Sequence, residues 1–405
     1  MVSALENGVK GGKWYSLMDK VYAPATLAAA WAKVQANAGA AGVDGQSVER
    51  FAAHAEQYLA ELSRTLQAGD YRPAAIRRVE IAKSGGGKRP LGIPTVKDRI
   101  AQTAVKFALE PILEARFHPA SFGFRPGRGA KDALREVDRL VKSGQCFVVD
   151  ADLKSYFDTI PHDRLLGRLR ECVSDGRILD LVKAWLKQDV VGECGRWTPV
   201  GGTPQGAVIS PLLANLYLHP LDERMAELGW SMVRYADDFV VLCSSMAEAQ
   251  AALAAIQAFA NESGLILHPD KTHIGDCRIA GQGFEFLGYR FEAGRRLVRK
   301  KSLLSLRDRI RAKTKRTSGK SLDRTIADLN PTLKGWFVYF KHATSGLKDV
   351  DAFVRRRLRA MLRKQQKRPG CGTSPQDRRR WPNAFFAAAG LFTLETALQH
   401  ERHSR

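Results

Sequence analysis

The chain has 405 residues, of which 44% are hydrophobic and 26% charged, and its formal net charge at pH 7 is +22. The hydrophobic content supports a globular fold and the length suffices for two or three domains, while the charge predicts a polyanionic partner, nucleic acid or an anionic membrane. No apolar run reaches the roughly 18 residues of a membrane span, and no signal-peptide pattern is present. We therefore expect a cytoplasmic protein without membrane segments.

The first third of the chain predicts helices at residues 27–37, 47–66 and 98–110, with Thr26 as a helix cap. A strand is predicted at 77–81, and a glycine-rich hairpin tip follows it, carrying Lys83, Lys88 and Arg89. Such a tip can approach a triphosphate and supply charge-assisted hydrogen bonds. The competing interpretation is a solvated basic turn.

Residues 121–128 read Ser-Phe-Gly-Phe-Arg-Pro-Gly-Arg and interleave two aromatics with two arginines. Loops of this kind can stack bases while they contact phosphates. Arg125 and Arg128 are therefore candidate nucleic-acid contacts. Packing of Phe122 and Phe124 in the core is an equally ordinary alternative.

Four acidic residues are associated with two strand-like segments. Residues 147–153 place Asp150 and Asp152 on one face by alternation. About 85 residues later, apolar runs at 232–235 and 239–242 predict a hairpin with Asp237 and Asp238 at its tip. Adjacent carboxylates repel unless cations neutralise them, and hard divalent metals prefer oxygen ligands. If the strands are neighbours, the acids can share two Mg²⁺ ions roughly 3.5–4 Å apart; otherwise this is a solvated Asp-Asp turn.

Between and after these strands, helices are predicted from about His162, at 212–228 and at 247–263, and a further strand at 284–290. The helix at 212–228 has Ser210 as its expected cap and Pro211 at its first position. Before it lies a Gly-Gly-Thr-Pro-Gln-Gly loop that ends at Gly206.

The C-terminal part of the chain is strongly basic. Residues 295–316 carry eleven Lys or Arg and one acid on a helical pattern, and residues 355–368 carry eight more and no acid. Solvated faces are one explanation, but phosphate tracking fits better. Together with the loop arginines above, the candidate nucleic-acid contacts are Arg125, Arg128, Lys271, Arg309, Arg311, Lys313, Arg355, Arg356 and Arg357.

Six segments resemble, in order, the motifs of bacterial group II intron reverse transcriptases, also called maturases, of the type without an H-N-H endonuclease. They include Arg-Pro-Leu-Gly-Ile-Pro, Phe-Gly-Phe-Arg-Pro-Gly, Asp152-Leu-Lys-x-Tyr-Phe-Asp, Thr-Pro-Gln-Gly, Tyr-Ala-Asp-Asp and Phe-x-Phe-Leu-Gly. The resemblance covers roughly residues 44–335. Residues 335–340 and 381–386 are similar to the family's thumb and C-terminal DNA-binding region.

The resemblance implies an α+β right-hand polymerase with fingers, an RRM-like palm, a helical thumb and a small basic C-terminal domain. We expect fingers and palm at 1–293, the thumb or maturase region at 294–350 and the DNA-binding region at 351–405. The implied metal-binding residues are Asp152, Leu153, Asp237 and Asp238, the three acids being catalytic. The implied nucleotide-binding residues are Lys83, Arg89, Phe157 and Gln205.

The implied function is RNA-directed DNA polymerisation with two Mg²⁺ ions, or Mn²⁺, on an intron RNA template with a primer strand, target DNA and deoxynucleoside triphosphates. The bulky Phe157, five residues after Asp152, predicts exclusion of a 2′-hydroxyl. Two alternatives stay open: a splicing-only RNA-binding maturase, and a reverse transcriptase recruited to a non-intron task such as phage defence. The sequence leaves the oligomeric state unknown.

Overall fold

The computed structural model describes residues 13–82, 87–193 and 195–403. The chain divides into two compact units, one ending at Ile274 and the other beginning at Gly275. This division lies before the domain boundary that we expected after residue 293.

The first unit begins with a helical layer around α6 (Val96–Glu114), whose side chains are buried along most of its length. It packs against α2 (Met18–Tyr22), α3 (Pro24–Asn37) and α5 (Ala55–Ala68). The helix predicted at 47–66 is interrupted, because α4 (Val48–Ala52) ends before α5 begins at Ala55. The other two predicted helices in this region, α3 and α6, are confirmed.

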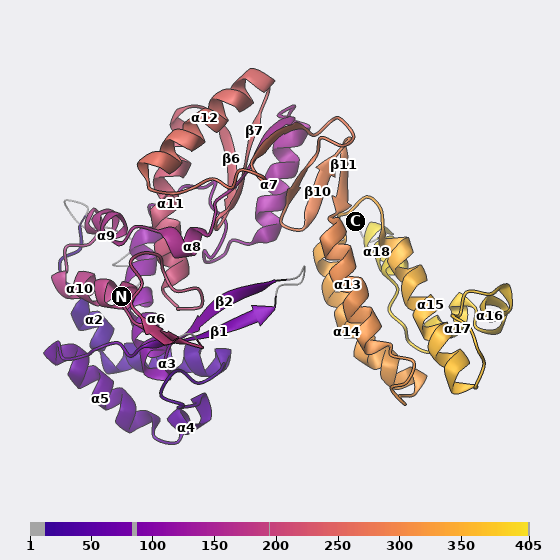
Figure 1. Ribbon diagram of the computed structural model, residues 1–405, viewed down its shortest axis with the longest axis horizontal. Helices are drawn as coiled ribbons and strands as arrows, with labels where there is room; N and C mark the ends of the chain where they lie inside the picture. Colours follow the sequence, from indigo (N-terminus) through magenta and orange to yellow (C-terminus); the bar gives the residue numbers. More distant parts are fainter. Residues whose placement is uncertain (1–12, 83–86, 194, 404–405) are drawn as a thin grey trace. The chain divides into compact units, whose positions relative to one another are not determined.

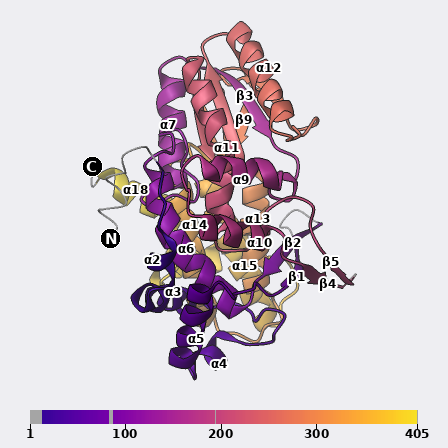
Figure 2. The same ribbon diagram turned by 90° about the vertical axis from the view of Figure 1, so that its left-hand side faces the viewer.

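A four-stranded sheet follows in the order β2-β1-β4-β5. Its strands are β1 (Ile76–Ala82), β2 (Lys88–Ile93), β4 (Val190–Gly192) and β5 (Gly195–Trp197). The contact between β1 and β4 is parallel, whereas β1–β2 and β4–β5 are antiparallel hairpins. Figure 2 shows the two hairpins side by side, so segments more than 100 residues apart in sequence form one sheet.

The second sheet of this unit has the order β6-β7-β3-β8. It is built from β3 (Phe147–Asp152), β6 (Ser231–Tyr235), β7 (Asp238–Cys243) and β8 (His273–Asp276). Alternate residues of β7, namely Phe239, Val241 and Cys243, belong to the same hydrophobic core as residues of α11 and α12. The strands at 147–153 and 232–242 are thereby confirmed.

The remaining helices of this unit include α7 (Ala130–Lys142), which packs on β6 and β7, and α8 (Tyr156–Thr159), α9 (His162–Arg170) and α10 (Gly176–Leu186). The long helices α11 (Ser210–Glu227) and α12 (Met246–Glu262) lie beside the strands (Figure 1). The predicted cap of α11 is wrong, because Ser210 is already helical and its hydroxyl donates to the Pro204 carbonyl at 2.8 Å.

The second unit starts with a three-stranded antiparallel sheet of β9 (Phe284–Phe286), β10 (Tyr289–Glu292) and β11 (Arg295–Val298). The single strand predicted at 284–290 is therefore wrong. The chain reverses at Leu287 and Gly288, which both have positive φ angles of 46° and 84°. The helical pattern expected from Arg295 likewise begins later, at Lys300.

Helices complete this unit: α13 (Lys300–Lys313), α14 (Leu322–Phe340), α15 (Leu347–Gln365), α16 (Pro375–Arg380), α17 (Asn383–Ala388) and α18 (Leu394–His403). Helix α15 packs on α13 and α18. The Asp351 carboxylate accepts the backbone N–H groups of Leu394 and Glu395 at 3.0 Å each and so caps α18. The expected boundary at 350/351 thus falls inside α15. Across the described ranges, no helix combines the length and apolar character needed to cross a membrane.

Candidate active site

The hairpin of β6 and β7 turns over two residues. Tyr235 pairs with Asp238, which leaves Ala236 and Asp237 as the turn. Two-residue hairpin loops require at least one positive φ angle, and Ala236 supplies it at 62°. Asp237 therefore sits at the tip and Asp238 at the first position of β7.

The strand β3 lies beside this hairpin. In the antiparallel pair β3–β7, Asp152 is directly opposite Asp238. Residues directly opposite in such a pair have Cβ atoms about 4.5–5.5 Å apart. The expected adjacency of the two acidic segments is confirmed, and all three acids lie at one end of the sheet.

The surroundings of the acids are partly apolar. Burial raises the pKa of Asp237 above its ordinary range, and the negative charge of Asp152 acts in the same direction. The nearby Arg234 and Lys271 oppose this rise without cancelling it. A carboxylate in such a position is stabilised by a bound cation.

A lysine that the sequence analysis placed among the nucleic-acid contacts lies at this site. Lys271 Nζ is 2.6 Å from Asp152 Oδ2. Its turn is tied to β3 because the His268 N–H donates to the Asp152 carbonyl at 2.7 Å. Lys271 thus pairs with one of the predicted metal-binding carboxylates, and its contact with nucleic acid stays a prediction.

The described residues contain no group of three His, Cys, Asp or Glu side chains placed to hold a metal ion. The three acids are thus neighbours in the sheet, but their side chains do not form a complete set of metal ligands. Their donor chemistry nevertheless fits a hard divalent cation, which takes carboxylate and carbonyl oxygens. Leu153, the fourth expected metal-binding residue, follows Asp152 and has a buried side chain, so only its backbone carbonyl has suitable chemistry.

Two of the expected nucleotide-binding residues line one cleft. Phe157 of α8 and Gln205 border a cavity of about 710 Å³, together with Pro90 and Gly92 of β2. The three acids are not among its lining residues. The structure therefore brings Phe157 and Gln205 together in a cleft that is also lined by residues of the β1–β2 hairpin.

The Gly-Gly-Thr-Pro-Gln-Gly loop connects these parts. Its Thr203 N–H donates to the Phe157 carbonyl at 2.6 Å, and its Gln205 carbonyl accepts the Gly92 N–H at 2.6 Å. Gly206 has a φ of 107°, and a Cβ there would lie 2.5 Å from the Gly92 carbonyl oxygen. Only glycine fits this close approach, which explains the residue type at the end of the loop.

The remaining expected clamp residues lie on the β1–β2 hairpin. Arg89 is exposed on β2, opposite Ile81 of β1. Lys83 lies outside the described residues. The neighbouring Lys88 forms an ion pair with Glu80 at 2.8 Å.

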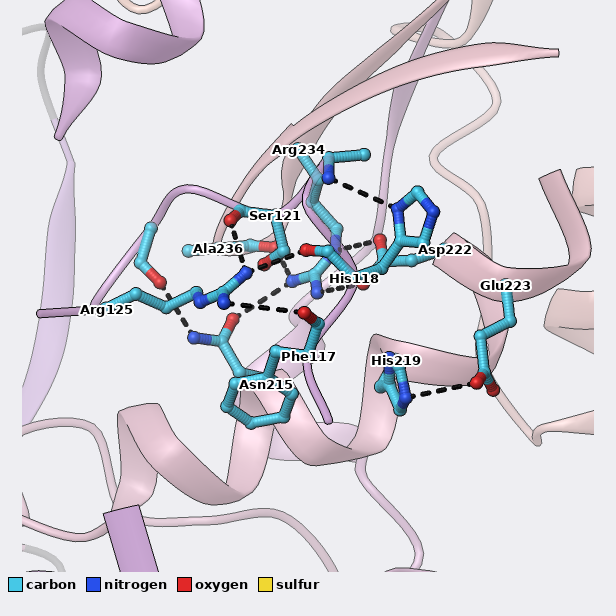
Figure 3. Close-up of polar contacts among 12 residues, drawn as sticks. Phe117, His118, Ser121, Arg125, Asn215, His219, Asp222, Glu223, Arg234 and Ala236 are labelled. Carbon is cyan, nitrogen blue, oxygen red and sulfur yellow. Dashed lines mark hydrogen bonds and ion pairs between the residues drawn. The ribbon is translucent and has the colours of Figure 1, made fainter. Parts of the chain in front are cut away.

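Arg125 is wrong as a nucleic-acid contact. Its side chain is buried, and its guanidinium binds Glu114 through two nitrogens, at 2.6 and 2.9 Å. It also donates to the carbonyls of His118 and Ser121 at 2.7 and 2.8 Å (Figure 3). Arg128 is half-buried and donates to the Pro119 carbonyl at 2.8 Å. These arginines shape the loop, so their charges are turned inward.

The basic residues of the second unit separate into two groups. Arg309 and Arg356 are exposed, and Arg355 is half-buried; Arg311 is exposed and bound to Asp308 at 2.5 Å. Lys313 and Arg357 instead donate to the carbonyls of Asp328 and Thr314, at 2.9 and 2.8 Å. These two half-buried side chains are thus engaged within the unit, and their contact with nucleic acid stays a prediction.

The first unit has the palm architecture of nucleic-acid polymerases, with acids at the end of a sheet that is backed by helices. A family model described as "Reverse transcriptase (RNA-dependent DNA polymerase)" matches residues 81–291. A second, "Group II intron, maturase-specific domain", matches residues 303–381. The chain belongs to the reverse transcriptase family, and its second unit contains a region that matches the maturase-specific domain of group II introns. The expected right-hand polymerase fold is confirmed.

Three similar proteins illustrate this membership. The chain is 35% identical to Protein YkfC of Escherichia coli over 64% of the chain and 76% of that protein. It is 38% identical to the group II intron-encoded protein LtrA of Lactococcus lactis over 43% of the chain, and 36% identical to an uncharacterized 91 kDa protein in the cob intron of Schizosaccharomyces pombe over 46% of it. The matches span 29% of LtrA and 22% of the cob intron protein, so the chain corresponds to only a part of these two relatives.

Proposed function

We propose that this protein is an RNA-directed DNA polymerase that copies intron RNA into DNA from a primer strand with deoxynucleoside triphosphates. The observation that carries the proposal is the cross-strand pair of Asp152 and Asp238, beside Asp237 on the turn. Carboxylates so placed suit in-line phosphoryl transfer, in which catalysis consists mainly of positioning and charge stabilisation.

Asp152, Asp237 and Asp238 would hold two Mg²⁺ ions, with the Leu153 carbonyl as a further oxygen donor; Mn²⁺ fits the same ligand types. When bound, such a metal pair lowers the pKa of the primer 3′-hydroxyl and neutralises charge on the triphosphate. The protein aligns the primer end with the α-phosphate. Lys271 Nζ, which lies 2.6 Å from Asp152 Oδ2, would compete with the cation for this carboxylate.

The deoxynucleotide enters at the cleft bordered by Phe157 and Gln205. The Phe157 ring packs edge-on against Tyr156 at a centroid distance of 5.5 Å, and Tyr156 is anchored by its hydroxyl to the Ala214 carbonyl at 2.7 Å. A ring held in this way resists displacement, so a 2′-hydroxyl meets a rigid apolar wall. Arg89, and Lys83 from outside the described residues, would bind the triphosphate.

A second function is favoured by the maturase-specific match at residues 303–381. We infer that exposed arginines of this unit, with Arg309 and Arg356 foremost, bind phosphates of intron RNA and of target DNA. Many such contacts add up to an affinity that depends steeply on salt. Binding of this kind supports splicing of the intron independently of polymerisation.

Primer extension on an RNA template tests the proposal. Wild-type protein with deoxynucleotides and Mg²⁺ is expected to make complementary DNA, and chelation of the metal is expected to stop synthesis. A control reaction offers ribonucleotides in place of deoxynucleotides. Absence of any product from folded protein that still binds RNA would instead support the splicing-only alternative.

The DNA next to the gene distinguishes an intron-encoded reverse transcriptase from one that was recruited to a non-intron task. A group II intron catalytic hairpin downstream supports intron mobility. Its absence, combined with an active polymerase, supports recruitment to another task.

A further inference from the structure

A buried polar cluster contacts the backbone of the acidic turn. It consists of Arg234 on β6 and of Asn215 and Asp222 on α11, and is called here the Arg234 cluster (Figure 3). Arg234 is completely buried, and Asn215 and Asp222 are each only 1% exposed. A buried guanidinium is strongly disfavoured unless it is paired and hydrogen-bonded, so its partners define what it does.

Two partners neutralise and orient the guanidinium. Nε donates to Asp222 Oδ1 at 2.7 Å and Nη2 donates to Asp222 Oδ2 at 2.5 Å, which makes the ion pair bidentate. Bidentate pairing fixes the plane of the guanidinium as well as its charge. Nη1 is thereby aimed away from Asp222, toward the hairpin turn.

Nη1 binds the turn itself. It donates to the Ala236 carbonyl at 2.9 Å and to Asn215 Oδ1 at 3.0 Å. The Ala236 carbonyl belongs to the peptide bond that leads into Asp237. The cluster therefore holds the backbone that carries a catalytic acid, at a residue whose positive φ is unfavourable for alanine.

Asn215 connects the cluster by a hydrogen bond to the loop on the other side of the turn. Its Nδ2 donates to the Gly123 carbonyl at 2.7 Å. Gly123 lies so close to the turn that a Cβ there would be 2.3 Å from the Ala236 nitrogen. Phe122 N–H also donates to the Arg234 carbonyl at 2.8 Å. The turn is thus clamped between α11 and the Phe-Gly-Phe-Arg loop.

We propose that Asn215, Asp222 and Arg234 are positioning residues for the metal-binding acids, and that they set the affinity of Asp237 and Asp238 for divalent cations. This inference rests on the proposed polymerase function. Groups that orient metal ligands from behind typically change metal affinity or activity 10- to 100-fold when they are removed. If the cluster served only as core packing, substitutions in it would change the stability of the protein and leave its metal affinity unaltered.

Asn215→Ala is the informative variant, because it removes one acceptor of Nη1 without leaving the buried arginine unpaired. Tyr217→Phe is its matched control: Tyr217 is buried on the same helix and donates to the Ser263 carbonyl, a residue outside the Arg234 cluster. Gly123→Ala, which pushes directly on the Ala236 nitrogen, is the second test variant in case Asn215→Ala fails to fold.

The measurements are Mn²⁺ binding to the protein without nucleic acid, by electron paramagnetic resonance, and the Mg²⁺ concentration that half-activates primer extension. We expect Asn215→Ala to weaken Mn²⁺ binding about tenfold and to raise the half-activating Mg²⁺ concentration similarly, with RNA affinity unchanged. Synthesis should recover at high Mg²⁺. Tyr217→Phe should change neither quantity.

If wild-type and Asn215→Ala proteins bind Mn²⁺ equally, or if Tyr217→Phe weakens binding as much, the positioning role is overturned. Equal Mn²⁺ binding by wild-type and Gly123→Ala proteins overturns it when Asn215→Ala does not fold. A wild-type protein that binds no Mn²⁺ and makes no DNA would instead refute the proposed function on which the inference stands. The two failures are therefore distinguishable.

Discussion

Lys271 Nζ lies 2.6 Å from Asp152 Oδ2, so a protein cation occupies the carboxylate that a metal ion would need. The contact is more than one-third exposed on both sides, at 58% and 41% of the side-chain surfaces, so solvent screens it. An exposed ion pair is worth roughly 0.2–1 kcal/mol. The lysine thus competes weakly with a metal and does not block the site.

Lys271→Gln is expected to tighten Mn²⁺ binding by less than about fivefold, because only a screened ion pair of this size is removed. The measurement is Mn²⁺ titration of the protein without nucleic acid. Lys154→Gln serves as the control, since Lys154 is an exposed lysine two residues after Asp152. Weaker Mn²⁺ binding in Lys271→Gln would show that the lysine organises the acids instead of competing for them.

The double variant Asp237→Ala/Asp238→Ala is expected to make no complementary DNA while it still binds intron RNA and supports splicing. Loss of electrostatic stabilisation at the reacting phosphate costs roughly 10²–10³ in rate per contact, whereas RNA affinity is summed over many phosphates. Primer extension, filter binding and a splicing assay at low Mg²⁺ measure the three quantities.

Asp180→Ala is the control for the double variant, because Asp180 is an exposed acid on α10. If the double variant is folded and loses intron splicing as completely as it loses DNA synthesis, both functions need the acidic turn. The separation of the two functions proposed above would then be incorrect.

Phe157→Ala is expected to reduce the preference for deoxynucleotides by roughly tenfold or more, since removal of a ring from a specificity pocket has effects of this size. The comparison is between kcat/KM values for a deoxynucleotide and its ribonucleotide on one RNA template. Phe385→Ala, which truncates an exposed aromatic of the other unit, controls for general loss of apolar surface. Unchanged discrimination in Phe157→Ala would remove this residue from the sugar-binding site.

The basic residues of the second unit should differ in the kind of damage that their substitution causes. Arg309→Gln and Arg356→Gln are expected to flatten the log–log dependence of RNA affinity on salt by about 0.7–0.9 for each lost phosphate contact. Arg357→Gln removes hydrogen bonds to Thr314 and should instead lower the melting temperature. The division of these residues by exposure would be wrong if Arg357→Gln flattened the salt dependence while Arg309→Gln and Arg356→Gln only lowered the melting temperature.

The strands of the acidic site could be predicted from local sequence. At 147–153, Asp150 and Asp152 alternate with apolar residues, and at 232–242 two short runs rich in β-branched and aromatic residues flank an acidic turn. The observed register then places Asp152 opposite Asp238. The break between α4 and α5 was not predictable, since neither Ala53 nor His54 is a turn residue. The reversal at Leu287 and Gly288 was missed because a leucine gives no turn signal and a single glycine within an apolar run is compatible with a continuous strand.

The roles of the arginines depend on contacts that no local pattern contains. Arg125 is surrounded by Glu114 and by carbonyls of its own loop, which a count of charges cannot reveal. The pairing of Arg234 with Asp222 did leave a signal: a charged residue stands in an otherwise apolar strand. That signal indicates a buried partner without identifying it.

The sheet order β6-β7-β3-β8 also determines when the protein can fold during its synthesis. The strand that carries Asp152 is central, yet both of its neighbours, β7 and β8, are translated later, from Asp238 and His273 onward. Until then its two edges and its apolar residues have no partner, and unpaired apolar strand edges promote aggregation. A nascent chain stalled between residues 160 and 230 should therefore depend on chaperones, whereas one stalled beyond residue 280 should already protect this strand.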